Sequence, residues 1–130
     1  MAGHPLIQNS VSTWAQPTPP EASQDRTRLL AAVVQKVCAL GPGRLRVAVD
    51  GRTASGKTSF GHELAEALAA SGRPVLRASL DDFKRPWRER GLYDRESGEG
   101  YYRNAFDYDA VVRLLLQPME GDGVCALCSI

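Results

Sequence analysis

Three segments of the chain repeat their apolar residues at the three- and four-residue spacing that predicts a helix with one buried face. They are residues 23–40, 57–70 and 107–116. Ser23 is a suitable N-cap for the first of these helices. Gly72 is suited to the left-handed conformation that ends the second, and Pro118 stops the third.

Two short apolar runs between the helices predict strands. The run 45–49 leads into Asp50, and the run 75–80 leads into Asp81 and Asp82. Helices that alternate with strands imply parallel pairing through right-handed crossovers. The sequence therefore predicts an α/β fold with a parallel sheet of two or three strands, which is thin for a sheet that helices normally cover on both faces.

The other segments lack a regular apolar period. Residues 1–22 combine several prolines with Ser, Thr and Gln, which indicates a flexible tail. Residues 83–105 are dense in charge and aromatic rings, which suit either the grip of a polar, ring-bearing substrate or a solvated lid surface. We interpret 23–118 as one partial domain and 119–130 as an atypical C-terminal tail, whose end is either a short strand or frayed.

Composition narrows the functional classes. With 130 residues, a net charge of +1 and 43% apolar residues, the chain suits one small domain and gives no electrostatic argument for nucleic acid or an anionic membrane. Neither a membrane span nor a secretory signal is apparent, so we expect a cytoplasmic protein. Cys125 and Cys128 have C-x-x-C spacing without further ligands, which favours incidental thiols. A sheet this thin also suggests a homo-oligomer.

The strongest motif lies between the first predicted strand and the second helix. Residues 51–58 read G-R-T-A-S-G-K-T and match the G-x-x-x-x-G-K-[ST] phosphate loop at each fixed position. The residues expected to bind the nucleotide are Gly51, Thr53, Ala54, Ser55, Gly56, Lys57, Thr58 and Ser59. Backbone amides in such a loop form a concave anion site, and the following helix directs its positive dipole end at the phosphates. A nucleoside triphosphate is the expected ligand.

Two residues at the end of this loop have individual roles. Lys57 should reach the β- and γ-phosphates and neutralise charge during transfer, which makes it a catalytic residue. The Thr58 hydroxyl should ligate Mg²⁺, a hard cation that prefers oxygen. The alternative is a glycine turn with an incidental lysine.

Carboxylates follow the second strand and open the third helix. Asp81 lies where ligands bind in open parallel sheets, so it could accept a proton from an attacking hydroxyl or help to hold Mg²⁺. The alternative is a solvated turn with an aspartate N-cap. The residues alone favour a first-turn or capping acid for Asp107 or Asp109, at the start of the helix at 107–116.

Together these residues resemble the uridine kinase group of P-loop kinases, whose relatives include phosphoribulokinase and the bacterial pantothenate kinase. The resemblance rests on the run 47–51 into Gly56-Lys57-Thr58, on D-D-F at 81–83 and on N-A-F-D at 104–107, and it covers about 27–118. It implies the three-layer α/β/α fold of P-loop NTPases, here incomplete. The chain departs from the group at Lys84, where an aromatic residue is common. It also ends before the further strands and the arginine-bearing lid, as a truncated kinase would.

The resemblance implies transfer of the ATP γ-phosphate to a hydroxyl of a small, nucleoside-like alcohol, with Mg²⁺. The general base of the group aligns with Asp81, which then also lies near the metal. Its ribose-binding aspartate aligns with Asp107, with Phe106 beside it as a second substrate contact. Two other functions remain open: a nucleotide-binding but inactive kinase remnant, and a P-loop ATPase that acts on a partner.

Overall fold

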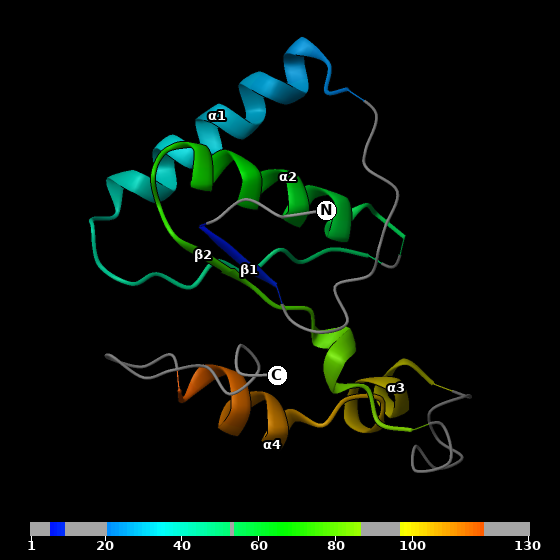
Figure 1. The fold of residues 1–130 in the computed structure, drawn as a ribbon. Coiled ribbons are helices and arrows are strands. Elements are labelled where there is room, and N and C mark those ends of the chain that lie inside the picture. The colour runs from blue at the N-terminus through cyan, green and yellow to red at the C-terminus, as the bar shows by residue number, and fades with distance from the viewer. Residues whose placement is uncertain (1–5, 10–20, 53, 87–96, 119–130) are drawn as a thin grey trace. The chain divides into compact units, whose positions relative to one another are not determined.

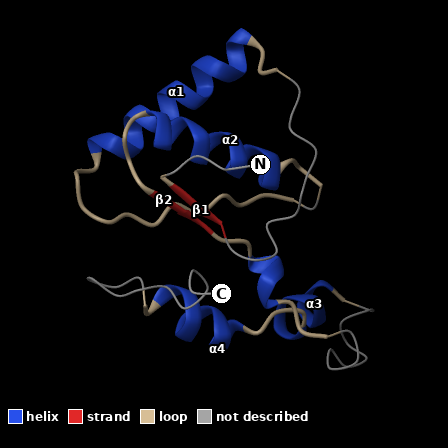
Figure 2. Ribbon diagram, viewed as in Figure 1, coloured by secondary structure: helices blue, strands red, loops and turns tan. Residues whose placement is uncertain are grey.

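The computed structural model describes residues 6–9, 21–52, 54–86 and 97–118. The chain divides into two compact units, and among the described residues the boundary falls between Arg77 and Ala78. The elements are helices and a two-stranded parallel sheet, so the predicted α/β class is confirmed at this level (Figure 2). Within the described residues, every helix is too short or too polar to cross a lipid bilayer.

The first unit stacks two helices on one face of a small sheet. Strand β1 (Ile7–Asn9) pairs in parallel with strand β2 (Val75–Arg77). Helix α2 (Lys57–Ala70) packs against both strands, and helix α1 (Gln24–Ala39) packs against α2 (Figure 1). The predicted helices at 23–40 and 57–70 are thereby confirmed.

The core of the first unit lies between α1 and α2. Its buried residues are Leu30, Val37, Leu64 and Leu68, with Val33, Val34, Leu45, Phe60 and Val75 packed around them. Burial of one such leucine side chain stabilises the fold by about 1.5–3 kcal/mol. Beside this core the Arg26 guanidinium donates two hydrogen bonds to the Glu63 carboxylate, at 2.5 and 2.8 Å, and so joins the two helices.

Local residues set the ends of these helices as the sequence predicts. The Ser23 hydroxyl accepts a hydrogen bond from the Arg26 amide at 3.2 Å and caps α1. Gly72, just beyond α2, has a φ of 86°, a left-handed conformation that glycine adopts without a Cβ penalty.

The strands differ from the prediction. Residues 45–49 form no strand, and Val47 and Val49 are 48% and 36% exposed, so the prediction of a strand there is wrong. The place beside β2 belongs instead to Ile7–Asn9, within the segment interpreted as a tail. Alternating apolar residues show that a segment can form a strand, whereas pairing depends on which backbone lies alongside. The second predicted strand, 75–80, is confirmed only for 75–77.

The second unit is built from short helical segments. They are the 3₁₀ helix η1 (Leu80–Phe83), helix α3 (Gly98–Asn104), helix α4 (Tyr108–Ala110) and the π-helical turn η4 (Val111–Leu116). The predicted helix at 107–116 is present, but its second half widens to π spacing, as the bond from the Gln117 amide to the Val112 carbonyl at 2.8 Å shows.

Backbone pairing and a small core join these segments. Residues 84 and 106 form an antiparallel bridge, and the Asp107 amide donates to the Phe83 carbonyl at 2.8 Å. The buried core residues are Phe83, Ala110 and Val111, with Leu114, Leu115 and Leu116 packed on them.

The predicted loop at 83–105 contains helix α3, so its C-terminal part is corrected. The Ser97 hydroxyl accepts a hydrogen bond from the Gly100 amide at 2.9 Å, and Glu99 pairs with Arg103 one turn later at 2.8 Å. Two glycines in the first turn conceal this helix from propensity reasoning, because glycine is a poor helix former. Residues 87–96 and the tail at 119–130, with Cys125 and Cys128, lie outside the described residues.

Candidate functional site: a phosphate loop and a second-unit carboxylate

The predicted phosphate loop leads directly into α2, as the motif requires. Gly56, the N-cap residue of α2, has a φ of 89°, and Ala54 has a φ of 59°. A Cβ on Gly51 would lie 2.9 Å from the Ser55 hydroxyl, closer than real Cβ contacts come. The left-handed torsion of Gly56 therefore favours glycine, whereas a Cβ at Gly51 would require the Ser55 side chain to shift. Thr53 lies outside the described residues.

The N-terminus of α2 carries no cap of its own. Among the described residues, its N-cap residue Gly56 provides no side-chain cap hydrogen bond, and the first turn contains no acidic residue. By contrast, α1 begins with the Ser23 cap and has Asp25 in its first turn. Because the first amides of a helix have no acceptor within the helix, the start of α2 is left ready to bind an anion.

Lys57 folds back over the loop. Its ammonium donates hydrogen bonds to the carbonyls of Gly51 at 2.8 Å and Arg52 at 2.7 Å. The ammonium is thus held against the carbonyls of the loop, close to any ligand that the loop binds. The loop residues Gly51, Arg52 and 54–56 are exposed, so a ligand in solution has access to them.

These residues fit the triphosphate of a nucleotide. The left-handed torsions, the uncapped amides and the Lys57 ammonium all favour a compact polyanion. Thr58 and Ser59, both half-buried in the first turn of α2, bring hydroxyl oxygens to the same place. A Thr58 hydroxyl there suits Mg²⁺ bound with phosphate oxygens. Among the described residues, no group of three or more His, Cys, Asp or Glu side chains is arranged to hold a metal.

Asp81 belongs to the second unit and lies in η1. The Ser79 hydroxyl caps this turn by accepting a hydrogen bond from the Asp81 amide at 3.2 Å. The Asp81 side chain is 54% exposed, and its carboxylate lies 3.5 Å from the Lys84 ammonium. The carboxylate is therefore solvent-facing and its one ion pair is long, which leaves its oxygens available to a ligand.

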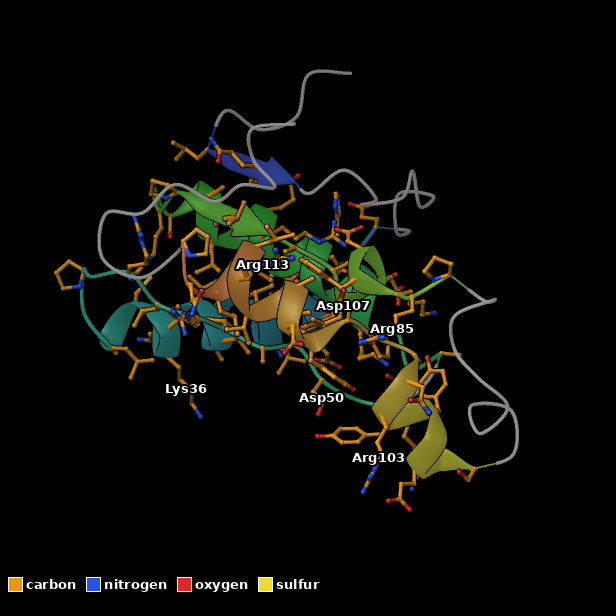
Figure 3. All side chains as sticks on the ribbon, turned by 90° about the horizontal axis from the view of Figure 1, so that it is seen from below. Lys36, Asp50, Arg85, Arg103, Asp107 and Arg113 are labelled. Atoms are coloured by element: carbon orange, nitrogen blue, oxygen red, sulfur yellow. The ribbon has the colours of Figure 1, made fainter. Side chains whose placement is uncertain are left out.

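Asp107 and Phe106 come together where the two halves of the second unit pair. The Asp107 carboxylate accepts a hydrogen bond from the Ala110 amide at 3.0 Å, so its predicted capping role is confirmed. The Arg85 amide donates to the Ala105 carbonyl at 2.8 Å, and its guanidinium donates to the Phe106 carbonyl at 3.4 Å. Figure 3 labels Arg85 and Asp107, both of the second unit. Segments far apart in the sequence thus bring Asp81 and Phe106 into one unit.

The Phe106 ring lies in a cluster of aromatic side chains. Tyr101 packs edge-on against it at 5.8 Å between centroids, Tyr108 lies at 6.1 Å, and the Lys84 ammonium lies 6.0 Å from the ring centre. Tyr102 is 69% exposed and packs on Tyr108. Exposed rings beside a cation can stack on a planar ligand, and they equally suit a solvated surface, so both interpretations of this loop stay predictions.

One ionisation in this cluster is perturbed. Partial burial, together with Tyr102 and Tyr101 nearby, raises the pKa of Tyr108. The protonated hydroxyl donates a hydrogen bond to the Tyr102 carbonyl at 2.6 Å. Tyr108 therefore acts as a neutral donor that fixes the end of α3 against the start of α4.

Sequence reasoning missed Arg77, whose guanidinium contacts the first turn of α2. It donates to the Thr58 carbonyl at 3.0 Å. The available signal was a charged residue inside the apolar strand run Val75-Leu76-Arg77, a position that normally faces either solvent or a buried partner.

Comparison with family models, with curated proteins and with solved structures finds no match for this chain.

Proposed function

We propose that the chain binds Mg-ATP at residues 51–59 and transfers the γ-phosphate to a hydroxyl of a small, nucleoside-like alcohol, as a uridine kinase-like member of the P-loop kinases. The observation that carries the proposal is the uncapped N-terminus of α2 behind a G-x-x-x-x-G-K-T loop whose lysine is already folded over it. A helix start without its own cap is costly unless water or an anion satisfies its amides.

In this proposal the loop amides and the Lys57 ammonium hold the β- and γ-phosphates. The Thr58 hydroxyl would hold Mg²⁺, which supplies positive charge to the phosphate oxygens when it is bound. Lys57 exchanges its bonds to the Gly51 and Arg52 carbonyls for bonds to phosphate oxygens. The exchange replaces neutral acceptors with charged ones and is therefore favourable.

Asp81 is the proposed general base. Its carboxylate accepts the proton of the acceptor hydroxyl, the hydroxyl oxygen bonds to the γ-phosphorus, and the bond from that phosphorus to the ADP oxygen breaks. Support comes from its exposed carboxylate, which the long contact to Lys84 leaves accessible. Phe106 and the free carboxylate oxygen of Asp107 are the proposed contacts to the ring and the sugar hydroxyls.

The proposal is tested by separating binding from transfer. Asp81→Asn should reduce turnover by about 10²–10⁴-fold and leave the Kd for Mg-ATP within about twofold, because it removes only a proton acceptor. Lys57→Ala should weaken nucleotide binding and turnover together. Calorimetric titration with Mg-ATP and a coupled ADP-release assay with a panel of nucleosides provide the two readouts.

Asp109→Asn is the matched control, because Asp109 is an exposed carboxylate at the start of α4, outside the proposed site. It should leave both readouts unchanged. Undiminished turnover in Asp81→Asn would remove Asp81 from the chemistry. ATP binding without transfer to any acceptor would favour the inactive remnant, and ADP release that needs no acceptor would favour an ATPase.

A further inference from the structure

Arg77 joins the end of strand β2 to the first turn of α2, immediately behind the phosphate loop. One guanidinium nitrogen donates to the Thr58 carbonyl at 3.0 Å, and another lies 3.4 Å from Nδ1 of His62. A Cβ on Gly61 would lie 3.8 Å from Nε of Arg77, an ordinary van der Waals distance, so the guanidinium runs along this side of the helix. All four residues belong to the first unit.

Among the described residues, no carboxylate forms an ion pair with Arg77. Partial burial lowers the pKa of Arg77, but a guanidinium stays protonated at neutral pH because its ordinary pKa is so high. A half-buried cation without a counter-ion is costly, and an anion bound at the start of α2 would offset that cost through space, without direct contact.

The position of Arg77 favours one ligand class. Its charge adds to the positive end of the α2 dipole and to the Lys57 ammonium, which the structure already holds over the loop. Three positive contributions at one helix N-terminus, two from α2 and one from β2, would favour a polyanion over a single phosphate. The hydrogen bond to Thr58 also fixes the turn from which the proposed Mg²⁺ hydroxyl comes.

We propose that Arg77 is a positioning residue for the phosphate loop, which holds the first turn of α2 on strand β2 and adds positive charge that selects the polyphosphate chain. The inference rests on the proposed nucleotide binding, whose loop it assists from behind. Arg77 itself contacts no phosphate in this scheme.

The test compares two substitutions at this position by calorimetric titration with Mg-ATP and with inorganic tripolyphosphate, at low and high salt. Arg77→Met, which keeps much of the apolar stem, should weaken both ligands by about tenfold and flatten the salt dependence of the Kd. Arg77→Lys keeps the charge, so it should lose only about twofold and retain the wild-type salt dependence. Inorganic monophosphate should bind much more weakly than tripolyphosphate and respond less to Arg77→Met.

Arg73→Met is the matched control. Arg73 follows the opposite end of α2 and donates to the carbonyls of Gly41 and Gly43 at 2.9 and 2.6 Å, so its loss changes the net charge equally and also removes hydrogen bonds to backbone. About 20 Å of helix separates it from the loop, beyond the Debye length in ordinary buffer. Its ligand affinities should stay within about twofold of the wild type.

Three outcomes would contradict the proposed role of Arg77 in part or in full. Equal losses in Arg77→Met and Arg77→Lys, with unchanged salt dependence, would overturn the charge contribution, and wild-type affinity in Arg77→Met would overturn the whole inference. If Arg77→Met fails to fold, Arg77→Gln repeats the charge test, since its amide can still donate to the Thr58 carbonyl. A wild-type protein that binds no tripolyphosphate or nucleotide would instead overturn the proposed function together with this inference.

Discussion

The two units of the chain build their candidate sites in different ways. In the first, the proposed phosphate-binding residues lie within one continuous stretch, 51–59, and the proposal assigns most of the contacts to the backbone. In the second, Asp81 and Phe106 are separated by 25 positions in sequence and are joined by the pairing of residues 84 and 106. The first site is formed by neighbouring residues and is supported by one contact between distant residues, the hydrogen bond from Arg77 to Thr58. The second exists only because two segments distant in sequence pair with each other.

This difference predicts different sensitivities. The loop depends on glycine torsions and on the start of α2, which the α1–α2 core supports. The proposed acceptor face, formed by Asp81, Phe106 and Asp107, depends on a smaller core. In the described part of the second unit, that core cluster has three buried side chains, at Phe83, Ala110 and Val111. A smaller core leaves less free energy to hold functional side chains in place. Stability experiments can therefore distinguish the units even before a substrate is known.

Truncation of a buried side chain in the core of the first unit should have the largest effect on stability. Leu64 is 4% exposed and lies between α1 and α2, so Leu64→Ala should lower the free energy of unfolding by about 2–5 kcal/mol. Hydrogen exchange resolved by segment should accelerate in α1 and α2 and stay unchanged in α4. Leu40→Ala, at a residue that is 71% exposed, is the control. Equal acceleration in both units would show that they unfold as one, which would break the comparison.

The helix caps offer a smaller and sharper contrast. Ser23→Ala and Asp107→Ala each remove a side-chain acceptor at a helix start, so each should cost about 1 kcal/mol of stability. Only Asp107→Ala should also raise the KM for the acceptor, since Ser23 has no proposed ligand. Asp107→Asn separates the two roles, because asparagine caps well but lacks the charge. Full recovery of KM in Asp107→Asn would mean that the charge of Asp107 is not used.

The sequence predicted the parts of this molecule that depend on neighbouring residues. The bounds of α2, the Ser23 cap and the glycine torsion at Gly56 follow from short-range patterns, and the structure confirms them. Asp107 was correctly identified as a possible cap for the same reason: its acceptor bond reaches only three residues ahead.

Features that depend on contacts between distant segments could not be predicted from the sequence. Residues 45–49 and 7–9 are both short segments that β2 could take as a neighbour, and alternation of apolar residues does not decide between them. The bond from Arg77 to Thr58 spans two elements, and the aromatic cluster around Phe106 depends on the same kind of contact. Whether the loop binds a nucleotide and Asp81 acts as a base stay predictions.

The smallest predicted effect concerns pH and is confined to the first unit. Hydrogen bonds from Arg26 lower the pKa of Glu63 below its ordinary value of 4.5, and the positive charge of Arg26 adds to this effect. Because the folded-state pKa is the lower one, the pair stabilises the fold fully above pH 4.5 and loses this contribution as the pH falls through the folded-state pKa. Arg26 stays charged throughout, so the titration is that of Glu63 alone.

Thermal unfolding measured from neutral pH to about pH 3 tests this prediction. At neutral pH, Glu63→Gln should unfold a few degrees below the wild type, and the gap should shrink in acid as the wild type loses its ion pair. Glu66→Gln, at an exposed position of α2, is the matched control and should follow the wild type at each pH. A gap that is constant across the range would mean that Glu63 contributes through packing. Hydrogen exchange gives a second readout. If acid removes the difference between Glu63→Gln and the wild type in the exchange rates of α1 and α2, and no difference is seen in α4, then the Arg26–Glu63 ion pair stabilises the first unit alone.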